Sequence, residues 1–291
     1  MKYPKTYIDE IRNRLKVSDV VRLKVNLKKR GKEFIGLSPF KNEKTPSFTV
    51  NDEKGFYHCF STAEHGNIFD FIMKLENLNF GEAVKMLAQR AGMQPYRFTK
   101  EDEKIEKENL RIQKLFEIYF NQCKDDLFSQ YKDTHLKYLI DRGLKIETIN
   151  YFKLGFCENS KKIQNKLFEN GFTSDELIKS GMYYKKDGTD ELVNRFKNRI
   201  TFPIQNYYNN FIGCGGRTVL ANALAKYINS PETNFFKKGF NLFNLNNAKK
   251  ESLNSNNLIL VEGYMDVVSL FNKGIKNVSA TLGTAMTTSQ I

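Results

Sequence analysis

Two carboxylates stand four residues apart just after a short apolar run near the carboxyl end of the sequence. The run, Leu-Ile-Leu-Val over 258–261, is too short for a helix and rich enough in branched side chains for a buried strand. Glu262 follows it directly, and Gly263 permits a tight turn. Asp266 then falls in the first turn of a helix predicted over 264–273. Mg²⁺ prefers oxygen ligands, so Glu262 and Asp266 are candidates to hold a divalent metal for phosphoryl transfer.

A plainer interpretation of these acidic residues stays open, since a carboxylate after a strand is commonly solvated or caps the next helix. The chain continues with Gly274, placed as the residue that ends the helix, and with a second apolar run over 278–282. A strand, a helix and a strand in one parallel sheet bring both strand ends to the same edge, where open α/β sheets keep their active sites. The pattern therefore predicts that Glu262 lies on that edge.

Composition sets wide limits on the class of protein. The 291 residues suffice for two or three domains with a buried core. Lys and Arg outnumber Asp and Glu by 46 to 33, and the formal charge of +13 favours polyanionic partners, a general compositional bias being the alternative. The four cysteines are scattered, as in proteins of a reducing compartment. No apolar run approaches a membrane span and no signal-peptide pattern is present, so we expect a cytoplasmic protein without membrane contact.

The first hundred residues predict a small sheet with packed helices. Ser18 and Asp19 are candidates to cap a short second helix, and Asn67 to cap a later one. Apolar runs flanking turn residues predict two hairpins. The expected order is helix 3–15, hairpin 25–37, hairpin 47–60, helix 68–75 and helix 80–91.

Two strings near the carboxyl end resemble a known family. Val-Glu-Gly-Tyr-Met-Asp over 261–266 and Thr-Leu-Gly-Thr-Ala over 281–285 are similar to the first half of the Toprim domain, in the form carried by bacterial DnaG-type DNA primases. The resemblance implies that Glu262 holds Mg²⁺ or Mn²⁺ directly. Asp266 would be a nearby ligand or would support the residues that bind the metal.

Two strings in the first hundred residues, over 38–48 and 56–60, resemble the zinc-binding domain that opens these primases. The family places three cysteines and one histidine on a zinc ribbon, and the corresponding residues here are Ser38, Lys41, Cys59 and Thr62. Structural zinc needs four soft or imidazole donors, so we expect zinc binding to be lost. A site built from His58, Cys59 and His65 is disfavoured, because neighbouring residues of a strand point to opposite faces.

In the family this domain captures single-stranded template. The basic residues favoured for that contact are Lys28, Lys29, Arg30, Lys32 and Lys44. The aromatic residues are expected mainly to supply the core, with base stacking as the alternative: Phe34, Phe40, Phe48, Phe56 and Phe60.

The middle of the chain carries further primase-like strings. Residues 99–109, within the linker predicted over 99–112, are almost wholly charged and predict a linker or the exposed start of a helix. The strings that resemble the primase RNA-polymerase domain lie at 138–144, 195–204, 213–219, 226–233 and 236–239. The resemblance implies a groove for template and nucleotides beside the Toprim edge, lined by Arg142, Arg195, Arg199, Arg217, Lys226, Tyr227, Asn229, Lys237 and Lys238. A structural ion pair is the alternative role for Arg195 and Arg199.

Elementary chemistry supports this groove independently of the family. Gly215 and Gly216 carry no side chain, so a nucleic-acid backbone can approach closely. Arg217 can bind phosphate through two parallel hydrogen bonds. Asn229 and Ser230 can bond sugar or phosphate oxygens.

The expected fold is α+β and multidomain. Residues 1–98 are expected to form a small antiparallel, zinc-ribbon-like template-binding domain that lacks zinc ligands, followed by the charged linker over 99–112. Residues 113–255 are expected to form the mixed α/β N-terminal subdomain of the primase RNA-polymerase domain. Residues 256–291 are expected to form a truncated Toprim domain that contains its first β-α-β. The family's Toprim sheet continues through a strand with an Asp-x-Asp pair that completes the metal site. This sequence has no such pair after Asp266, so we expect a fragment without primer-synthesis activity of its own.

The resemblance implies a DNA primase, a metal-dependent DNA-directed RNA polymerase that makes short RNA primers in bacterial replication. The implied partners are a single-stranded DNA template, ribonucleoside triphosphates, the RNA primer and, in the full-length protein only, the replicative helicase. Two alternatives stay open. One is a nucleic-acid-binding module without catalysis, derived from a primase, and the other is a Toprim nuclease or topoisomerase relative.

Overall fold

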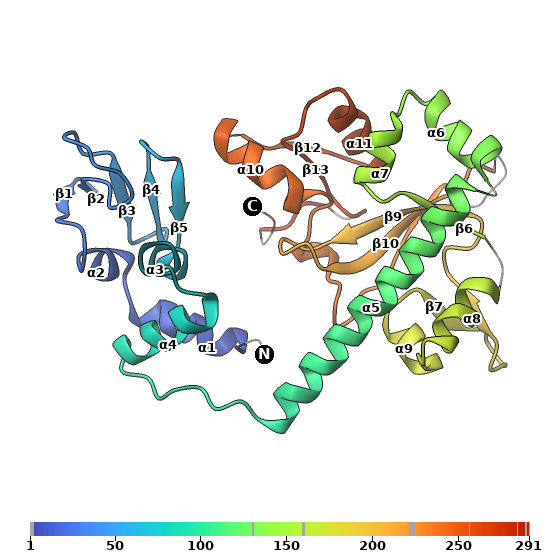
Figure 1. Ribbon diagram of the computed structural model, residues 1–291, viewed down its shortest axis with the longest axis horizontal. Helices are drawn as coiled ribbons and strands as arrows, with labels where there is room; N and C mark the ends of the chain where they lie inside the picture. The colour runs from blue at the N-terminus through green and yellow to red at the C-terminus, as the bar shows by residue number, and fades with distance from the viewer. Residues whose placement is uncertain are drawn as a thin grey trace. The chain divides into compact units, whose positions relative to one another are not determined.

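The computed structural model describes residues 3–129, 131–158, 161–220, 225–255, 257–283, 285–288 and 290. The chain divides into two compact units, Met1–Glu106 and Lys107–Ile291, called here the N-terminal unit and the C-terminal unit (Figure 1). Among the described residues, no helix combines the length and the apolar character that crossing a membrane requires.

An antiparallel five-stranded sheet forms the centre of the N-terminal unit, with its strands in the order β1-β2-β3-β4-β5. Both predicted hairpins are confirmed, since β1 pairs with β2 and β3 pairs with β4. The strand β5 was not predicted, because its sequence Glu-His-Gly has no apolar alternation. The elements are α1 (Lys5–Arg14), α2 (Val17–Val21), β1 (Lys28–Arg30), β2 (Glu33–Gly36), β3 (Phe48–Asn51), β4 (Phe56–Cys59), β5 (Glu64–Gly66), α3 (Ile68–Glu76) and α4 (Phe80–Arg90).

Side-chain caps begin two of these helices. Asn67 caps α3 as predicted, and Asn79 caps α4 in the same way. The prediction for the second helix is wrong, because neither Ser18 nor Asp19 caps α2. The Ser18 hydroxyl and amide instead donate to the carboxylate of Asp52, at 2.7 and 2.8 Å, so this side chain ties α2 to the turn after β3.

Stacked aromatic rings fill the core of the N-terminal unit. Phe48 and Tyr57 stack with ring centroids 5.2 Å apart, and Phe71 meets Tyr57 edge-on at 5.4 Å. Of the five phenylalanines predicted for the core, Phe48 is fully buried, and Phe34, Phe40 and Phe56 are half-buried. The prediction is wrong for Phe60, which is 71% exposed, because it lies beyond the end of β4 with its ring against His58 rather than the core.

A four-stranded antiparallel sheet, in the order β11-β10-β9-β6, forms the centre of the C-terminal unit. The long helix α5, green in Figure 1, begins at Lys100, so the charged segment takes the second of its two predicted forms and is the largely exposed start of a helix. The elements up to the sheet edge are α5 (Lys100–Phe128), a π-helical turn (Lys132–Leu136), α6 (Lys137–Asp141), α7 (Ile146–Tyr151), β6 (Gly155–Cys157), α8 (Lys161–Glu169), α9 (Ser174–Lys179), the β7 (Tyr183–Lys185) and β8 (Leu192–Asn194) hairpin, β9 (Arg199–Gln205), β10 (Phe211–Arg217) and β11 (Tyr227–Asn229).

The predicted strand–helix–strand unit is confirmed at the carboxyl end. A short 3₁₀ helix (Lys238–Phe240) and α10 (Leu245–Ser255) precede it, and its members are β12 (Ile259–Val261), α11 (Tyr264–Asn272) and β13 (Val278–Ala280). The two strands run parallel, with Ile259 opposite Val278. The expectation of a buried first strand is wrong. Ile259 and Leu260 are 39% and 40% exposed, because within the described residues β12 pairs only with β13.

Helix α11 docks this unit onto the rest of the C-terminal unit, and Figure 1 shows it beside α7. Asn272 at its end accepts from the Lys145 amide and the Thr148 hydroxyl, at 2.9 and 2.8 Å, and donates to the Gly143 carbonyl at 2.9 Å. At the other end, the Tyr264 ring stacks on Phe202 of β9 at 5.3 Å. These contacts fix the connection between α6 and α7 relative to the carboxylates that begin α11.

Candidate functional site

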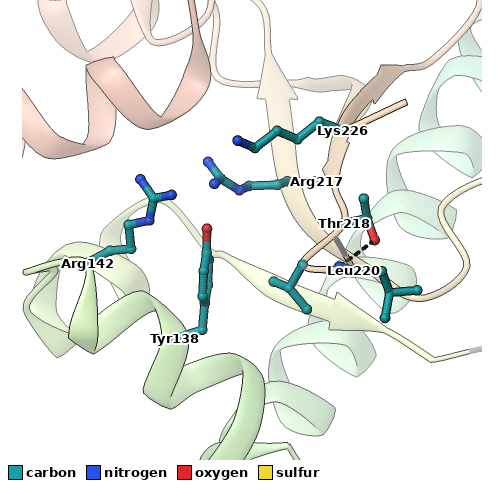
Figure 2. Close-up of a pocket in the computed structure, with 7 residues that line it drawn as sticks. Tyr138, Arg142, Arg217, Thr218, Leu220 and Lys226 are labelled. Carbon is teal, nitrogen blue, oxygen red and sulfur yellow. Dashed lines mark hydrogen bonds between the residues drawn. The ribbon is translucent and has the colours of Figure 1, made fainter. Parts of the chain in front are cut away.

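A cavity of about 280 Å³ in the C-terminal unit, called here the basic pocket, carries three cations on its walls. Figure 2 shows the guanidinium groups of Arg142 and Arg217 and the ammonium of Lys226 converging on one space, with the Tyr138 hydroxyl directed into it. The lining residues are Tyr138, Arg142, Arg217, Thr218, Val219, Leu220 and Lys226. In the part of the chain that the structure describes, none of the three cations pairs with a carboxylate, so the pocket suits an anionic ligand.

Arg217 ends β10 and is only 4% exposed. Its guanidinium lies over the rings of Tyr138 and Tyr227, at 5.4 and 5.1 Å, and donates to the Tyr227 hydroxyl. Its Nε is buried and has no hydrogen-bond partner among the described residues. A buried charge is costly unless it is paired, so an anion in the pocket would supply what this guanidinium lacks.

Tyr138 is a pocket residue that the sequence reasoning missed. Its ring lies under Arg142 as well as Arg217, with the Arg142 guanidinium 5.5 Å from the ring centroid. Such stacking holds a guanidinium in place while leaving its N–H groups available to a ligand. Arg142 itself follows α6 directly, and the next residue is Gly143, whose carbonyl Asn272 anchors.

Arg199 supports the pocket from behind and does not line it. Its Nη1 donates to the backbone carbonyl of Lys226 at 3.3 Å, and that carbonyl also accepts from the Thr218 amide at 3.1 Å. Burial lowers the pKa of Arg199. Arg199 forms no ion pair with the described residues, so the alternative role predicted for it is wrong. Arg199 therefore fixes the backbone that carries Lys226 and Tyr227.

Asn229 and Ser230 contact protein rather than open space. Asn229 accepts from the Tyr264 hydroxyl at 2.6 Å and donates to the Leu282 carbonyl at 2.9 Å, so it joins β11 to the strand–helix–strand unit. The prediction that Ser230 bonds a ligand is wrong. This residue is fully buried, and its hydroxyl accepts from the Cys214 amide at 3.0 Å.

The two glycines of β10 serve packing rather than a passing nucleic-acid backbone. A Cβ on Gly215 would lie 2.5 Å from the Tyr264 ring, and one on Gly216 would lie 2.6 Å from the Phe196 ring. The expectation that they open the surface to a ligand is therefore wrong. They let two aromatic side chains pack directly against the strand.

Besides Arg199, three of the predicted cations lie outside the basic pocket. Arg195 lines a different cavity of about 500 Å³, with its guanidinium 4.9 Å from the Tyr184 ring centroid. Lys237 forms an ion pair with Glu232 at 3.7 Å, and the Lys238 amide donates to the same carboxylate at 3.1 Å. Sequence similarity grouped these residues with Arg217, but the fold does not.

The two carboxylates stand where the sequence predicts, after β12 and in the first turn of α11. Both are exposed. Asp266 Oδ2 accepts from the Gly263 amide at 3.1 Å and so caps α11, as the plainer interpretation held, while its second oxygen has no hydrogen-bond partner among the described residues. The negative charge of Asp266 reaches Tyr227, whose pKa is raised chiefly by burial and in small part by Asp266, with Arg217 acting in the opposite direction. Tyr227 thus contacts Arg217 of the basic pocket and also senses the charge of Asp266.

Glu262 and Asp266 provide the oxygen donors that Mg²⁺ or Mn²⁺ takes, so the residues present suit part of such a site. Within the described residues, no group of three or more His, Cys, Asp or Glu side chains gathers as a metal site would require. This holds in the N-terminal unit as well. Ser38, Lys41, Cys59 and Thr62 offer one soft donor, and His58 pairs with His65 across strands β4 and β5, ring centroids 6.1 Å apart.

Three protein families match successive parts of the chain. They are the CHC2 zinc finger over residues 3–104, the N-terminal domain of the DNA primase catalytic core over 122–249, and the Toprim domain over 256–291. The DNA primase of Clostridium acetobutylicum is 39% identical over 290 residues, which cover 97% of this chain and 47% of that protein. The chain thus spans about half the length of the curated relatives it matches.

Solved structures agree with this assignment. The Aquifex aeolicus primase, with its zinc-binding and RNA polymerase domains, is 30% identical with a TM-score of 0.57 and covers 98% of this chain and 68% of its own. A DnaG primase catalytic domain bound to single-stranded DNA is 34% identical with a TM-score of 0.56, covering 64% of this chain and 57% of its own. The order of zinc-ribbon, catalytic-core and Toprim parts, together with these likenesses, shows that the chain belongs to the DnaG-type DNA primase family.

Proposed function

We propose that this chain forms the template- and nucleotide-binding part of a primase, the enzyme that makes short RNA primers on single-stranded DNA. The observation that carries the proposal is the basic pocket, in which Arg217 is buried without a carboxylate partner among the described residues. A polyanion is the ligand class that three converging cations select. The likeness to a primase domain bound to single-stranded DNA supports the same assignment.

The residues of the basic pocket have different roles in binding. Arg217 and Arg142 donate to phosphate oxygens, while Tyr138 holds both guanidinium planes. Lys226 adds an exposed ammonium, and Arg199 keeps the backbone of that residue in place. Phosphate contacts of this kind position a strand and carry no sequence preference.

The carboxylates are proposed as the start of the catalytic centre. Glu262 would hold Mg²⁺ or Mn²⁺ directly, and Asp266 would contribute its second oxygen or orient water around the ion. Such an ion supplies stabilisation of the charge that develops when a ribonucleotide 3′-hydroxyl attacks an α-phosphate and pyrophosphate leaves. Asp266 also fixes the turn that carries Glu262, because it caps the helix at Gly263.

The N-terminal unit is proposed to capture template. A cavity of about 500 Å³ beside β2 is rimmed by Lys24, Lys28 and Lys44, and two of these belong to the predicted contact set of Lys28, Lys29, Arg30, Lys32 and Lys44. We retain the division into template-binding (1–98), linking (99–112), core (113–255) and Toprim (256–291) segments as part of the proposal. Ribonucleoside triphosphates, the primer and, for the longer protein, a replicative helicase in the bacterial cytoplasm complete it.

A binding module without catalysis is the second candidate. It is favoured by one observation, that no third His, Cys, Asp or Glu joins the two carboxylates within the described residues. It predicts template binding with no transfer of ribonucleotides, whereas the enzyme predicts both.

Substitution of the buried arginine tests the basic pocket. Arg217→Ala should weaken binding of single-stranded DNA about tenfold, because a hydrogen-bonded charge contact is lost. It should also reduce the slope of log affinity against log salt by about 0.7 for each phosphate contact removed. Fluorescence anisotropy over a salt series measures both quantities.

Two controls accompany this measurement. Lys186→Ala removes one positive charge from the exposed turn after β7 and should leave both quantities nearly unchanged. Arg142→Ala removes an exposed pocket cation with less risk to folding, and should act in the same direction as Arg217→Ala. Unchanged affinity and slope in both arginine variants would remove the pocket from the template path.

A further inference from the structure

The N-terminal unit matches a family described as a zinc finger, yet its side chains do not suit the ion. Its zinc-type donors are one cysteine, Cys59, and two histidines, His58 and His65. His58 and Cys59 are neighbours on β4, where burial alternates along the strand, so they face opposite sides of the sheet. Structural zinc takes four Cys or His donors in a tetrahedron, and one face here offers a single thiol.

A hydrogen-bonded cluster surrounds that thiol. The Cys59 Sγ lies 3.1 Å from the Ser38 hydroxyl and 3.4 Å from the Ser61 hydroxyl. Glu43 Oε1 accepts from the amides of Ser38 and Ser47, at 2.7 and 3.1 Å, and from the Ser47 hydroxyl at 2.7 Å. The Ser47 and Ser61 hydroxyls lie 2.8 Å apart. We call these five residues the serine–glutamate cluster.

The cluster joins separate segments of the chain. Ser38 follows β2, Ser47 precedes β3, Cys59 ends β4 and Ser61 lies in the turn between β4 and β5. Glu43 lies in the loop between β2 and β3 and reaches both ends of that loop through its contacts with Ser38 and Ser47. A single metal ion in a zinc ribbon constrains loops by the same topology, one centre bonded to several chain segments.

Hydrogen bonding within the cluster also shifts the pKa values of its two ionisable members. Burial raises the pKa of Cys59, but its interactions with Ser38, Ser61 and Thr62 outweigh burial and bring the pKa to about 7. Hydrogen bonds, the first of them from the Ser47 side chain, lower the pKa of Glu43 against the opposing effect of burial. Neighbouring hydroxyl and amide groups therefore favour the ionised form of both side chains.

We propose that the N-terminal unit folds without zinc, and that the serine–glutamate cluster, centred on Glu43, holds its loops where a metal ion would otherwise do so. The proposal does not rest on the proposed function, because its readouts are metal content and stability rather than DNA binding or synthesis.

Metal content and chelation test the first half. The full chain, purified from cells grown with added zinc, should contain far less than one zinc per chain by inductively coupled plasma mass spectrometry. Its melting temperatures should be the same with and without EDTA. About one zinc per chain, or a melting temperature lowered by EDTA, would overturn the proposal.

Substitution of Glu43 tests the second half. Glu43→Gln keeps the size of the side chain but removes a charged acceptor, and should lower the melting temperature of the N-terminal unit by about 5 °C. Glu53→Gln, an exposed carboxylate in the turn between β3 and β4, is the matched control and should leave that temperature within about 1 °C. Equal melting temperatures for both variants and the unmodified chain would show that the cluster does not hold the fold.

Restoring the donors provides a gain-of-metal test. The triple variant Ser38→Cys, Lys41→His, Thr62→Cys supplies, with Cys59, four soft or imidazole donors. It should bind about one zinc per chain and become sensitive to EDTA, while the unmodified chain does neither. Zinc bound equally by both chains would mean that the ion needs none of these residues, and the proposal would fail.

Discussion

At the scale of single residues, the tyrosine between two arginines determines how the basic pocket is built. Tyr138 lies under the guanidinium groups of both Arg142 and Arg217, so each cation rests on an aromatic face. The two arginines could be predicted because they stand in strings that resemble a family. Tyr138 could not, since an aromatic residue on a short helix usually packs into a core. Its role depends on where β10 brings Arg217, which the sequence does not encode locally.

The carboxylates provide a prediction at this scale. Asp266→Ala should lower the free energy of unfolding of the C-terminal unit by about 1 kcal/mol, because it removes a helix cap and a favourable charge at a helix N-terminus. Glu262→Ala should change that free energy by less than about 0.5 kcal/mol, because Glu262 is exposed and forms no hydrogen bond or ion pair with the described residues. Urea unfolding followed by circular dichroism measures both. A larger cost for Glu262→Ala than for Asp266→Ala would reverse the assigned roles.

Glycine and serine mark the limit of prediction at this scale. Gly215, Gly216 and Ser230 were expected to face a ligand, and each faces a neighbouring side chain or backbone amide instead. The sequence shows that a side chain is small, but it does not show which other residue occupies the space beside that side chain in the fold. That space is occupied by Tyr264 and Phe196, one of them 49 residues away along the chain from Gly215.

At the scale of elements, the sequence predicted correctly those helices and strands that depend on residues close together along the chain. The two N-terminal hairpins and the α3 cap follow from turn and cap residues within a few positions. The strand β5 and the exposure of β12 depend on which strands lie alongside them, so neither could be predicted from the local sequence. Parallel pairing of β12 with β13 was predictable because a strand–helix–strand connection constrains the direction of both strands.

The contact between α5 and α9 yields a pH prediction. Arg111 of α5 pairs with Glu176, which also caps α9 by accepting from the Thr173 amide at 2.9 Å. The hydrogen bond from Arg111, against the opposing effect of burial and with help from Thr173, lowers the pKa of Glu176 to about 2. A carboxyl with a depressed pKa in the folded state stabilises the fold above its unfolded value of 4.5, and loses this contribution as the pH falls toward 2.

Glu176→Gln should therefore melt at a lower temperature than the unmodified chain at pH 6, with the difference shrinking steadily between about pH 4.5 and pH 2. Melting curves in a buffer series measure the difference. Asp187→Asn, an exposed carboxylate in the turn between β7 and β8, should show no such trend and serves as the control. A difference that is constant or grows with acidity would show that Glu176 contributes through its shape rather than its charge.

At the scale of the whole molecule, the chain is two units with separate cores. Among the described residues, the buried apolar side chains of Met1–Glu106 form one cluster, and those of Lys107–Ile291 form two others, with no cluster drawing on both units. A boundary near residue 100 was predicted from the charged, stripe-free segment there. Its helical form was one of two alternatives, because a charged segment can be solvated equally well as coil or as helix.

Separate cores predict two unfolding transitions that respond to different substitutions. Gly215→Ala should lower the melting temperature of the C-terminal unit by about 5 °C, because its Cβ would meet the Tyr264 ring at 2.5 Å and force the core to shift. Gly239→Ala, whose Cβ would lie 3.3 Å from a Thr287 methyl, is the milder control in the same unit. The transition of the N-terminal unit should stay unchanged in both variants, and should move only when the serine–glutamate cluster is altered. Differential scanning calorimetry of the full chain measures both transitions. A single transition that is shifted by Gly215→Ala and by Glu43→Gln alike would mean that α5 couples the two cores into one cooperative fold.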